Sequence, residues 1–121
     1  MIANIDPSRI SQVLSNLITN ALGFTKDNRV SIIIERRTAH IDGKNSNTEP
    51  EEITVTVSDT GTGIDKEILP RLFEKFITKS ERGTGLGLFI SKGIIEAHGG
   101  RIFGKNNEDG QGASFTFTVP M

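Results

Sequence analysis

The chain has 121 residues, of which 35% are hydrophobic, so it fits one compact domain with a substantial core. Fourteen basic and fifteen acidic side chains leave a net charge of −1, which excludes the general attraction that steers proteins to nucleic acids or anionic lipids. Without cysteine, thiol catalysis and cysteine-ligated metals are excluded, and no apolar run approaches the roughly 20 residues that span a bilayer.

The first part of the chain predicts one helix and two strands. Residues 6–22 have apolar side chains at the spacing of an amphipathic helix, which Asp6 can cap and in which Pro7 suits the first position. Residues 30–35 are rich in β-branched side chains, and apolar and polar residues alternate over 53–58. These two patterns are typical of strands.

The middle of the chain predicts a long connection and a second helix. Residues 38–52 are polar with little periodicity, which favours a hairpin connection over a linker between domains. Residues 66–76 have helical spacing, with Pro70 tolerated if it lies in the first turn. We expect Phe73 and Phe76, on the apolar side of this helix, to lie in the core.

The last part of the chain predicts a third helix and a terminal hairpin. The helix covers residues 86–98 and stops at the glycines 99–100. Alternation over 101–105 and 113–119, on either side of the turn 108–112, indicates two strands. Because strand pairs and helices are separated along the chain, we expect an α+β fold in which about three helices cover one face of a single sheet.

Two asparagines four residues apart, Asn16 and Asn20, lie on one side of the first predicted helix, with Gln12 one turn earlier. Amide oxygens are hard ligands, and Mg²⁺ is commonly held by one or two protein oxygens together with substrate phosphates. One well-placed asparagine could therefore anchor a metal–nucleotide complex. The alternative is that both amides bond only solvent or loop backbone at the edge of the core.

Two glycine clusters follow. Asp59 ends the second predicted strand and enters a loop with Gly61 and Gly63, where the backbone can approach a flat ligand and the carboxylate can accept a hydrogen bond from an amino group. The alternative is an aspartate in an ordinary turn. The second cluster, residues 83–88, precedes the third predicted helix, where free backbone amides favour phosphate oxygens unless the cluster is simply a flexible loop.

Taken together, these motifs resemble the sequence boxes of the catalytic ATP-binding domain of sensor histidine kinases, within the GHKL superfamily of gyrase, Hsp90 and MutL-type ATPases. The N box matches residues 12–21, the G1 box 59–63, the F box 72–76 and the G2 box 83–88. The resemblance covers about residues 5–120, so we expect one catalytic domain over 1–121. It implies a Bergerat-type two-layer α/β sandwich with a mixed, mostly antiparallel sheet.

The resemblance also implies that ATP or ADP binds with Mg²⁺ between the first helix, the end of the sheet and a short lid over residues 77–84. Asn20 would ligate Mg²⁺, and Asn16 would lie near the metal and the phosphates. Asp59 would accept a hydrogen bond from the adenine amino group in a pocket shaped by Gly61 and Gly63. The phosphates would lie beside the lid and the start of the third helix, at Lys79, Gly83, Thr84, Gly85, Leu86, Gly87 and Leu88.

The chain departs from the family pattern in two places. The family often has a lysine three residues after the second asparagine, where this chain has Gly23, so that phosphate contact is missing unless Lys26 or Lys79 supplies it. The family also often has a further strand ahead of the first helix, which residues 1–4 are too few to form. We therefore expect an excised or trimmed domain.

The residue at position 16 bears on the reaction. The ATPase branches of the superfamily carry glutamate there, because attack by water needs a base that the amide of Asn16 cannot provide. A neutral imidazole is already nucleophilic, so asparagine favours transfer to histidine over hydrolysis. A non-catalytic nucleotide-binding or docking module, for which Gly23 is the best support, and an ATPase are the other interpretations.

The resemblance sets expectations for partners and location as well. The chain contains no phosphoacceptor motif, so the histidine is expected on a separate domain of the parent protein, with a response regulator downstream. Alone, the domain is expected to be a monomer that does not phosphorylate itself. We expect it in the cytoplasm, within a parent that can be membrane-bound, and without contacts of its own to membrane or nucleic acid.

Overall fold

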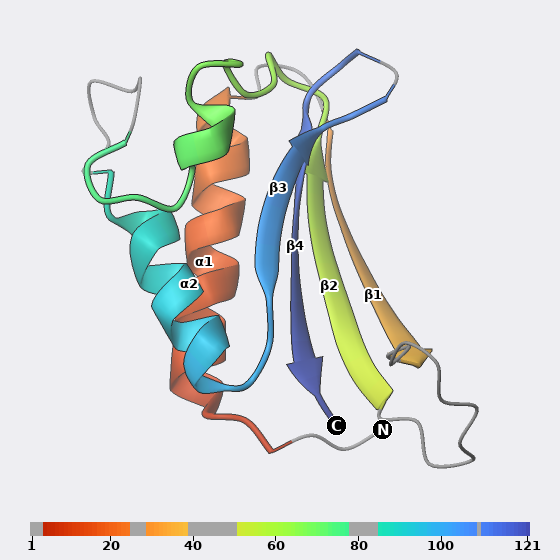
Figure 1. Cartoon of the computed structure of the whole chain (residues 1–121). Coiled ribbons are helices and arrows are strands. Elements are labelled where there is room, and N and C mark those ends of the chain that lie inside the picture. Colours follow the sequence, from red (N-terminus) through yellow and green to blue (C-terminus); the bar gives the residue numbers. More distant parts are fainter. Residues whose placement is uncertain (1–3, 25–28, 39–50, 78–84, 109) are drawn as a thin grey trace, which may run out of the picture.

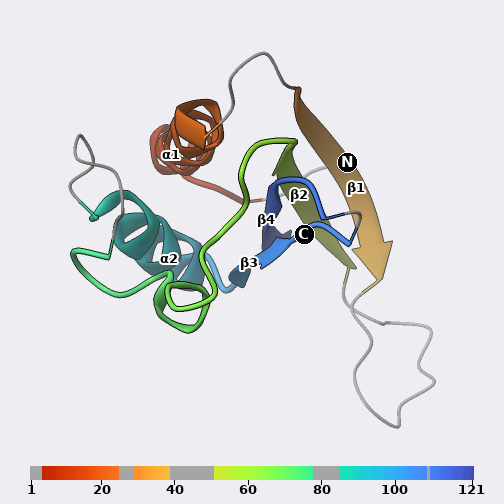
Figure 2. The ribbon, with the colours of Figure 1, turned by 90° about the horizontal axis from the view of Figure 1, so that it is seen from above.

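The fold has two layers, in which helices α1 (Pro7–Phe24) and α2 (Gly87–Ala97) pack on one face of a sheet (Figures 1 and 2). The structure is a computed structural model that describes residues 4–24, 29–38, 51–77, 85–108 and 110–121. Both helices begin and end within two residues of the predicted positions. The predicted α+β sandwich is confirmed.

The sheet consists of two antiparallel hairpins laid side by side. Its strands lie in the order β1 (Val30–Thr38), β2 (Glu51–Asp59), β4 (Ala113–Pro120) and β3 (Ile102–Asn106). Every pairing among the described strands is antiparallel, so the described part of the chain contains no parallel pair. The connection predicted between β1 and β2 lies mostly outside the described residues.

The core lies between the sheet and the helices because apolar side chains alternate along the central strands. Val57 of β2 and Phe117 of β4 are buried against Leu17 of α1 and Ile95 of α2. The intervening residues of β2 and β4 are mostly serine and threonine and face away from the helices. The alternation predicted for β2 and the apolar stripe predicted for α1 are therefore confirmed.

The ends of the helices follow the predicted signals. Asp6 Oδ1 accepts the N–H of Arg9 at 3.2 Å, as an N-cap does, and α2 stops where Gly99 adopts a φ of +80°. His98 joins the two helices, because its Nε2 accepts the N–H of Asp6 at 3.0 Å and its Nδ1 donates to the Ile94 carbonyl at 2.8 Å. These bonds give His98 a structural role.

The second predicted helix is wrong in its extent. Within 66–76, the only helical segment is the short 3₁₀ helix η1 (Leu69–Arg71). Pro70 lies inside η1, where it fixes its own backbone, has no N–H to donate and restricts the residue before it. Phe73 still packs against the core, but Phe76 is 70% exposed with a φ of +65°, so its predicted place in the core is also wrong.

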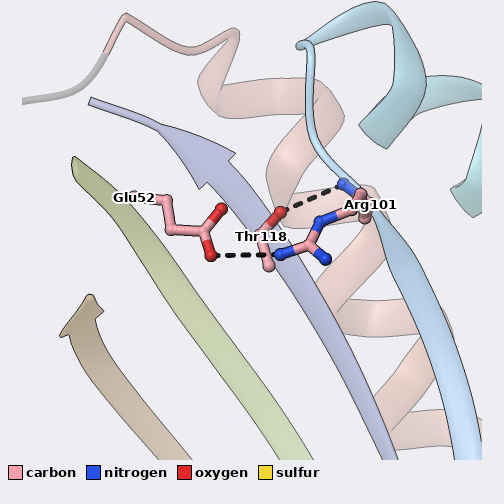
Figure 3. Close-up of polar contacts among 3 residues, drawn as sticks. All are labelled: Glu52, Arg101 and Thr118. Carbon is pink, nitrogen blue, oxygen red and sulfur yellow. Dashed lines mark hydrogen bonds and ion pairs between the residues drawn. The ribbon is translucent and has the colours of Figure 1, made fainter. Parts of the chain in front are cut away.

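Arg101, between α2 and β3, contacts both β4 and β2 at the end of β2 farthest from Asp59 (Figure 3). The backbone N–H of Arg101 donates to Thr118 Oγ1 at 3.1 Å, and its guanidinium forms an ion pair with Glu52 Oε1, also at 3.1 Å. The Arg101 side chain is mostly exposed, so the ion pair contributes at most about 1 kcal/mol. The Arg101 side chain thus reaches across β4 to β2.

Candidate functional site

A cavity of about 400 Å³ is lined by residues of α1, α2 and the end of the sheet at which β2 finishes. Its volume lies in the range of roughly 300–1,000 Å³ that is typical of small-ligand sites. Asn20, Asp59 and Gly63 all line it, so the structure brings together residues that are up to 43 positions apart. Leu72 and Phe115 belong to its apolar wall.

The two carboxylate oxygens of Asp59 have different surroundings. The side chain is only 3% exposed, and Oδ1 accepts the N–H of Gly61 at 2.9 Å and the N–H of Ala113 at 3.4 Å. Across the described residues, Oδ2 accepts no hydrogen bond. Oδ2 is not among the buried atoms without a partner, so it can accept a hydrogen bond from a ligand in the cavity, such as one that presents an amino group.

Asn20 lines the same cavity from the last turns of α1. Its side-chain amide has no hydrogen-bond partner within the described ranges, so it is available to a ligand. No group of three or more acidic or histidine side chains in these ranges is placed to hold a metal ion. A single neutral amide fits a Mg²⁺ ion that arrives with phosphates and fits a free ion poorly.

Asn16 lies one turn before Asn20 and contacts α2. Its Nδ2 donates to the Gly87 carbonyl at 3.2 Å and to Ser91 Oγ at 3.1 Å. Because a carbonyl only accepts, the NH₂ group of Asn16 faces α2 and its Oδ1 faces away from that helix. Asn16 is not part of the cavity lining, and its predicted proximity to a metal and phosphates stays a prediction.

The start of α2 carries the described part of the second glycine cluster. Leu88 lines the cavity, and α2 begins at Gly87 after the N-cap residue Leu86, without a side-chain cap, so its first backbone N–H groups suit an anion. Gly85, with a φ of +72°, accepts the N–H of Phe76 at 2.9 Å, and this bond draws together the chain on both sides of 78–84. The predicted contacts Lys79, Gly83 and Thr84 lie outside the described residues.

Sequence reasoning missed three polar residues around the site. Ser91 is completely buried and accepts the hydrogen bond of Asn16. Asn106 and Asn107, in the hairpin between β3 and β4, bond the loop that follows β2. The partners through which they reach the site, Asn16, Ile64 and Asp59, are 42 to 75 positions away in the sequence, so no local pattern could have identified them.

Comparison with known proteins identifies the family. Residues 5–121 match the family described as histidine kinase-, DNA gyrase B- and HSP90-like ATPase. The chain is 40% identical over 116 residues to the sensor protein FixL of Bradyrhizobium diazoefficiens, covering 95% of this chain and 21% of that protein. It is 37% identical over 123 residues to the sensor protein kinase WalK of Staphylococcus saprophyticus, covering 96% of this chain and 18% of that protein.

Solved structures agree with these sequence relatives. The catalytic domain of histidine kinase ThkA superposes with a TM-score of 0.74 at 35% identity, covering 96% of this chain and 69% of that one. Full-length ShkA in complex with AMPPNP gives a TM-score of 0.69 at 34% identity, covering 93% and 21%.

The chain spans about a fifth of the length of the curated relatives that it matches. Among the described helices, none has the length and apolar character needed to cross a membrane. The family match covers nearly the whole chain, and its relatives are sensor histidine kinases. The chain therefore belongs to the histidine kinase-, DNA gyrase B- and HSP90-like ATPase family.

Proposed function

We propose that this domain binds Mg-ATP in the cavity and donates the γ-phosphoryl group to a histidine on a separate phosphoacceptor domain. The observation that carries the proposal is that Asn20 and Asp59 line one cavity, where a single nucleotide can contact both. The similarity to sensor histidine kinases supports the same reaction. ShkA, solved with AMPPNP, supports nucleotide binding by this fold.

The base is proposed to lie beside Asp59. The free Oδ2 of Asp59 accepts a hydrogen bond from the amino group of adenine, while Oδ1 remains bonded to the backbone. Leu72 and Phe115 provide apolar surface for the flat ring. Gly63 also lines this part of the cavity, and its φ of +81° is a conformation that suits glycine.

The phosphates are proposed to lie between Asn20 and the start of α2. When bound with ATP, Mg²⁺ neutralises phosphate charge and helps to orient the transferred group. Asn20 offers it one amide oxygen, and the uncapped backbone N–H groups at the start of α2 donate to phosphate oxygens. The protein thus contributes mainly positioning and charge stabilisation.

Asn16 supports transfer to histidine over hydrolysis. Its NH₂ group already donates to Gly87 and Ser91, and an amide cannot take a proton from water. An imidazole nucleophile does not depend on such a base. We further propose that the phosphoacceptor domain belongs to the same parent protein, that a response regulator receives the phosphoryl group and that the reaction takes place in the cytoplasm.

Two measurements test the proposal. Titration calorimetry of the purified domain should show binding of ATP and ADP that strengthens with Mg²⁺. Labelled ATP, mixed with the domain and a histidine phosphoacceptor domain of a related sensor kinase, should give an acid-labile phosphoprotein. Absence of nucleotide binding would refute the site, whereas binding without labelling would favour a non-catalytic module. Steady phosphate release by the isolated domain would indicate an ATPase.

A further inference from the structure

The hairpin between β3 and β4 lies against the loop that follows β2. Asn106, the last residue of β3, makes two hydrogen bonds to the backbone of Ile64. Its Oδ1 accepts the Ile64 N–H at 2.6 Å, and its Nδ2 donates to the Ile64 carbonyl at 3.0 Å. These are the bonds that a neighbouring strand would make, supplied here by one side chain.

Asn107 holds the other end of the same loop. Its Nδ2 donates to the carbonyl of Asp59 at 2.9 Å and to the carbonyl of Gln111 at 2.9 Å. Its Oδ1 accepts the hydroxyl of Ser114 at 2.5 Å. The loop 59–64 is therefore bonded to the hairpin at its first and last residues.

Two glycines make this close approach possible. A Cβ atom on Gly112 would lie 2.0 Å from the Asp59 carbonyl oxygen, and a Cβ on Gly63 would lie 2.8 Å from Asn106 Oδ1. Both residues have positive φ angles, +79° and +81°, which glycine adopts at no steric cost. Loop and hairpin thus pack with their backbones almost in contact.

We propose that Asn106 and Asn107 are positioning residues for base recognition. This inference rests on the proposed function, because it assigns the two asparagines to the same nucleotide site. Asp59 carries the carboxylate that faces the base, and Gly63 and Ile64 line the cavity beside it. Because the hairpin is bonded to both ends of the loop 59–64, it holds the Asp59 carboxylate at a fixed place in the cavity.

A role limited to folding makes a different prediction. If the two asparagines only stabilise the hairpin, their loss lowers the free energy of unfolding but leaves the choice between bases unchanged. If they position the loop, their loss weakens the contact of Asp59 with the 6-amino group of adenine. Discrimination between ATP and ITP, which carries a 6-keto group instead, then falls in protein that is still folded.

The test compares the wild-type domain with Asn106→Ala, Asn106→Asp and Lys105→Ala. Lys105 is exposed and precedes Asn106 on β3, so Lys105→Ala is the matched control. Calorimetry with Mg-ATP and Mg-ITP measures affinity and base discrimination, and hydrogen exchange of the Ile64 amide without nucleotide measures the loop contact. Asn106→Asp keeps an acceptor for the Ile64 N–H but sets a second acceptor against the Ile64 carbonyl, so the loop contact and the discrimination should still be weakened.

We expect Asn106→Ala to lose about tenfold in ATP affinity, with a smaller loss for ITP, and to exchange the Ile64 amide faster. Lys105→Ala should match the wild type in all three measurements.

Wild-type discrimination in a folded Asn106→Ala domain would overturn the inference, as would an unprotected Ile64 amide in the wild type. If the wild type bound no adenine nucleotide, the proposed function would fail, and this inference, which depends on it, would be overturned with it. Binding by the wild type with no change in Asn106→Ala would overturn the inference alone.

Discussion

Replacing Asp59 by asparagine should change which base the cavity accepts. The N–H groups of Gly61 and Ala113 both point at Oδ1 of Asp59, so an asparagine at this position has to place its carbonyl oxygen there. Its NH₂ group then occupies the position of Oδ2 and faces the cavity. The substitution conserves shape but converts the acceptor offered to the base into a donor.

The size of the effect follows from the hydrogen bonds involved. A bond to a charged group contributes about 1.5–3 kcal/mol, and a donor of the ligand left facing another donor costs about 1–3 kcal/mol more. Because about 1.4 kcal/mol corresponds to a factor of ten, ATP affinity of Asp59→Asn should fall by at least roughly 60-fold. The 6-keto oxygen of ITP accepts from the new NH₂ group, so ITP should bind Asp59→Asn better than ATP does.

Titration calorimetry with Mg-ATP and Mg-ITP, on the wild type and on Asp59→Asn, measures this reversal directly. Asp65→Asn is the control for loss of charge, because Asp65 also lines the cavity but is exposed, and its ATP to ITP ratio should match the wild type. Asp59→Ala offers neither donor nor acceptor and should lose ATP without favouring ITP. The assignment of the base to Asp59 is wrong if Asp59→Asn stays folded and retains wild-type preference for ATP.

Two further predictions concern the metal and the core. Mg²⁺ should increase the ATP affinity of Asn20→Ala about tenfold less than that of the wild type, because one amide ligand is lost, whereas ATP affinity in EDTA should be unchanged. If calorimetry shows that Mg²⁺ increases both affinities equally, the role of Asn20 is refuted. Phe117→Ala should lower the free energy of unfolding in urea by about 3–5 kcal/mol, because Phe117 is completely buried. Phe103→Ala, at a side chain that is 44% exposed, should cost less than about 1 kcal/mol, and equal losses would contradict the packing described for the core.

The elements that could be predicted are those whose pattern and environment agree. On α1, Val13 and Leu17 repeat at helical spacing and are both buried, and on β2, Val55 and Val57 alternate with hydroxyl side chains. The segment 66–76 has apolar residues at helical spacing too, but it forms turns and the short helix η1, which contains Pro70, instead of a regular helix. Apolar spacing alone therefore does not distinguish a helix from turns that bury most of the same side chains.

Phe76 shows why the prediction of its place in the core failed. Its backbone N–H bonds to the carbonyl of Gly85, nine positions along the chain, and its φ is positive. A Cβ atom on Gly85 would lie 2.5 Å from Phe76 Cα, so the two backbones meet only because position 85 is glycine. The direction of the Phe76 side chain is thus set by a distant backbone contact that helical periodicity does not contain.

Within the site, the predictable part is the set of residues that a ligand would touch. Asp59, Gly63 and Asn20 each belong to a local motif, and all three line the cavity. The residues that support the site, such as Asn106, which bonds Ile64, and Ser91, which bonds Asn16, carry no local pattern because their partners come from other elements. A motif in the sequence can name a contact residue, but the support of that residue depends on the assembled fold.

The two ends of the proposed nucleotide site are anchored differently. At the base end, the loop that begins with Asp59 is bonded to the β3–β4 hairpin, so recognition of the base lies within the sheet layer. At the phosphate end, Asn20 belongs to α1, and α2 is joined to α1 through the bond from Asn16 to Gly87. A nucleoside without phosphates reaches only the first of these ends. In the proposed site, a triphosphate with its metal would bridge the sheet to both helices, and its binding energy would also stabilise the packing of one layer on the other.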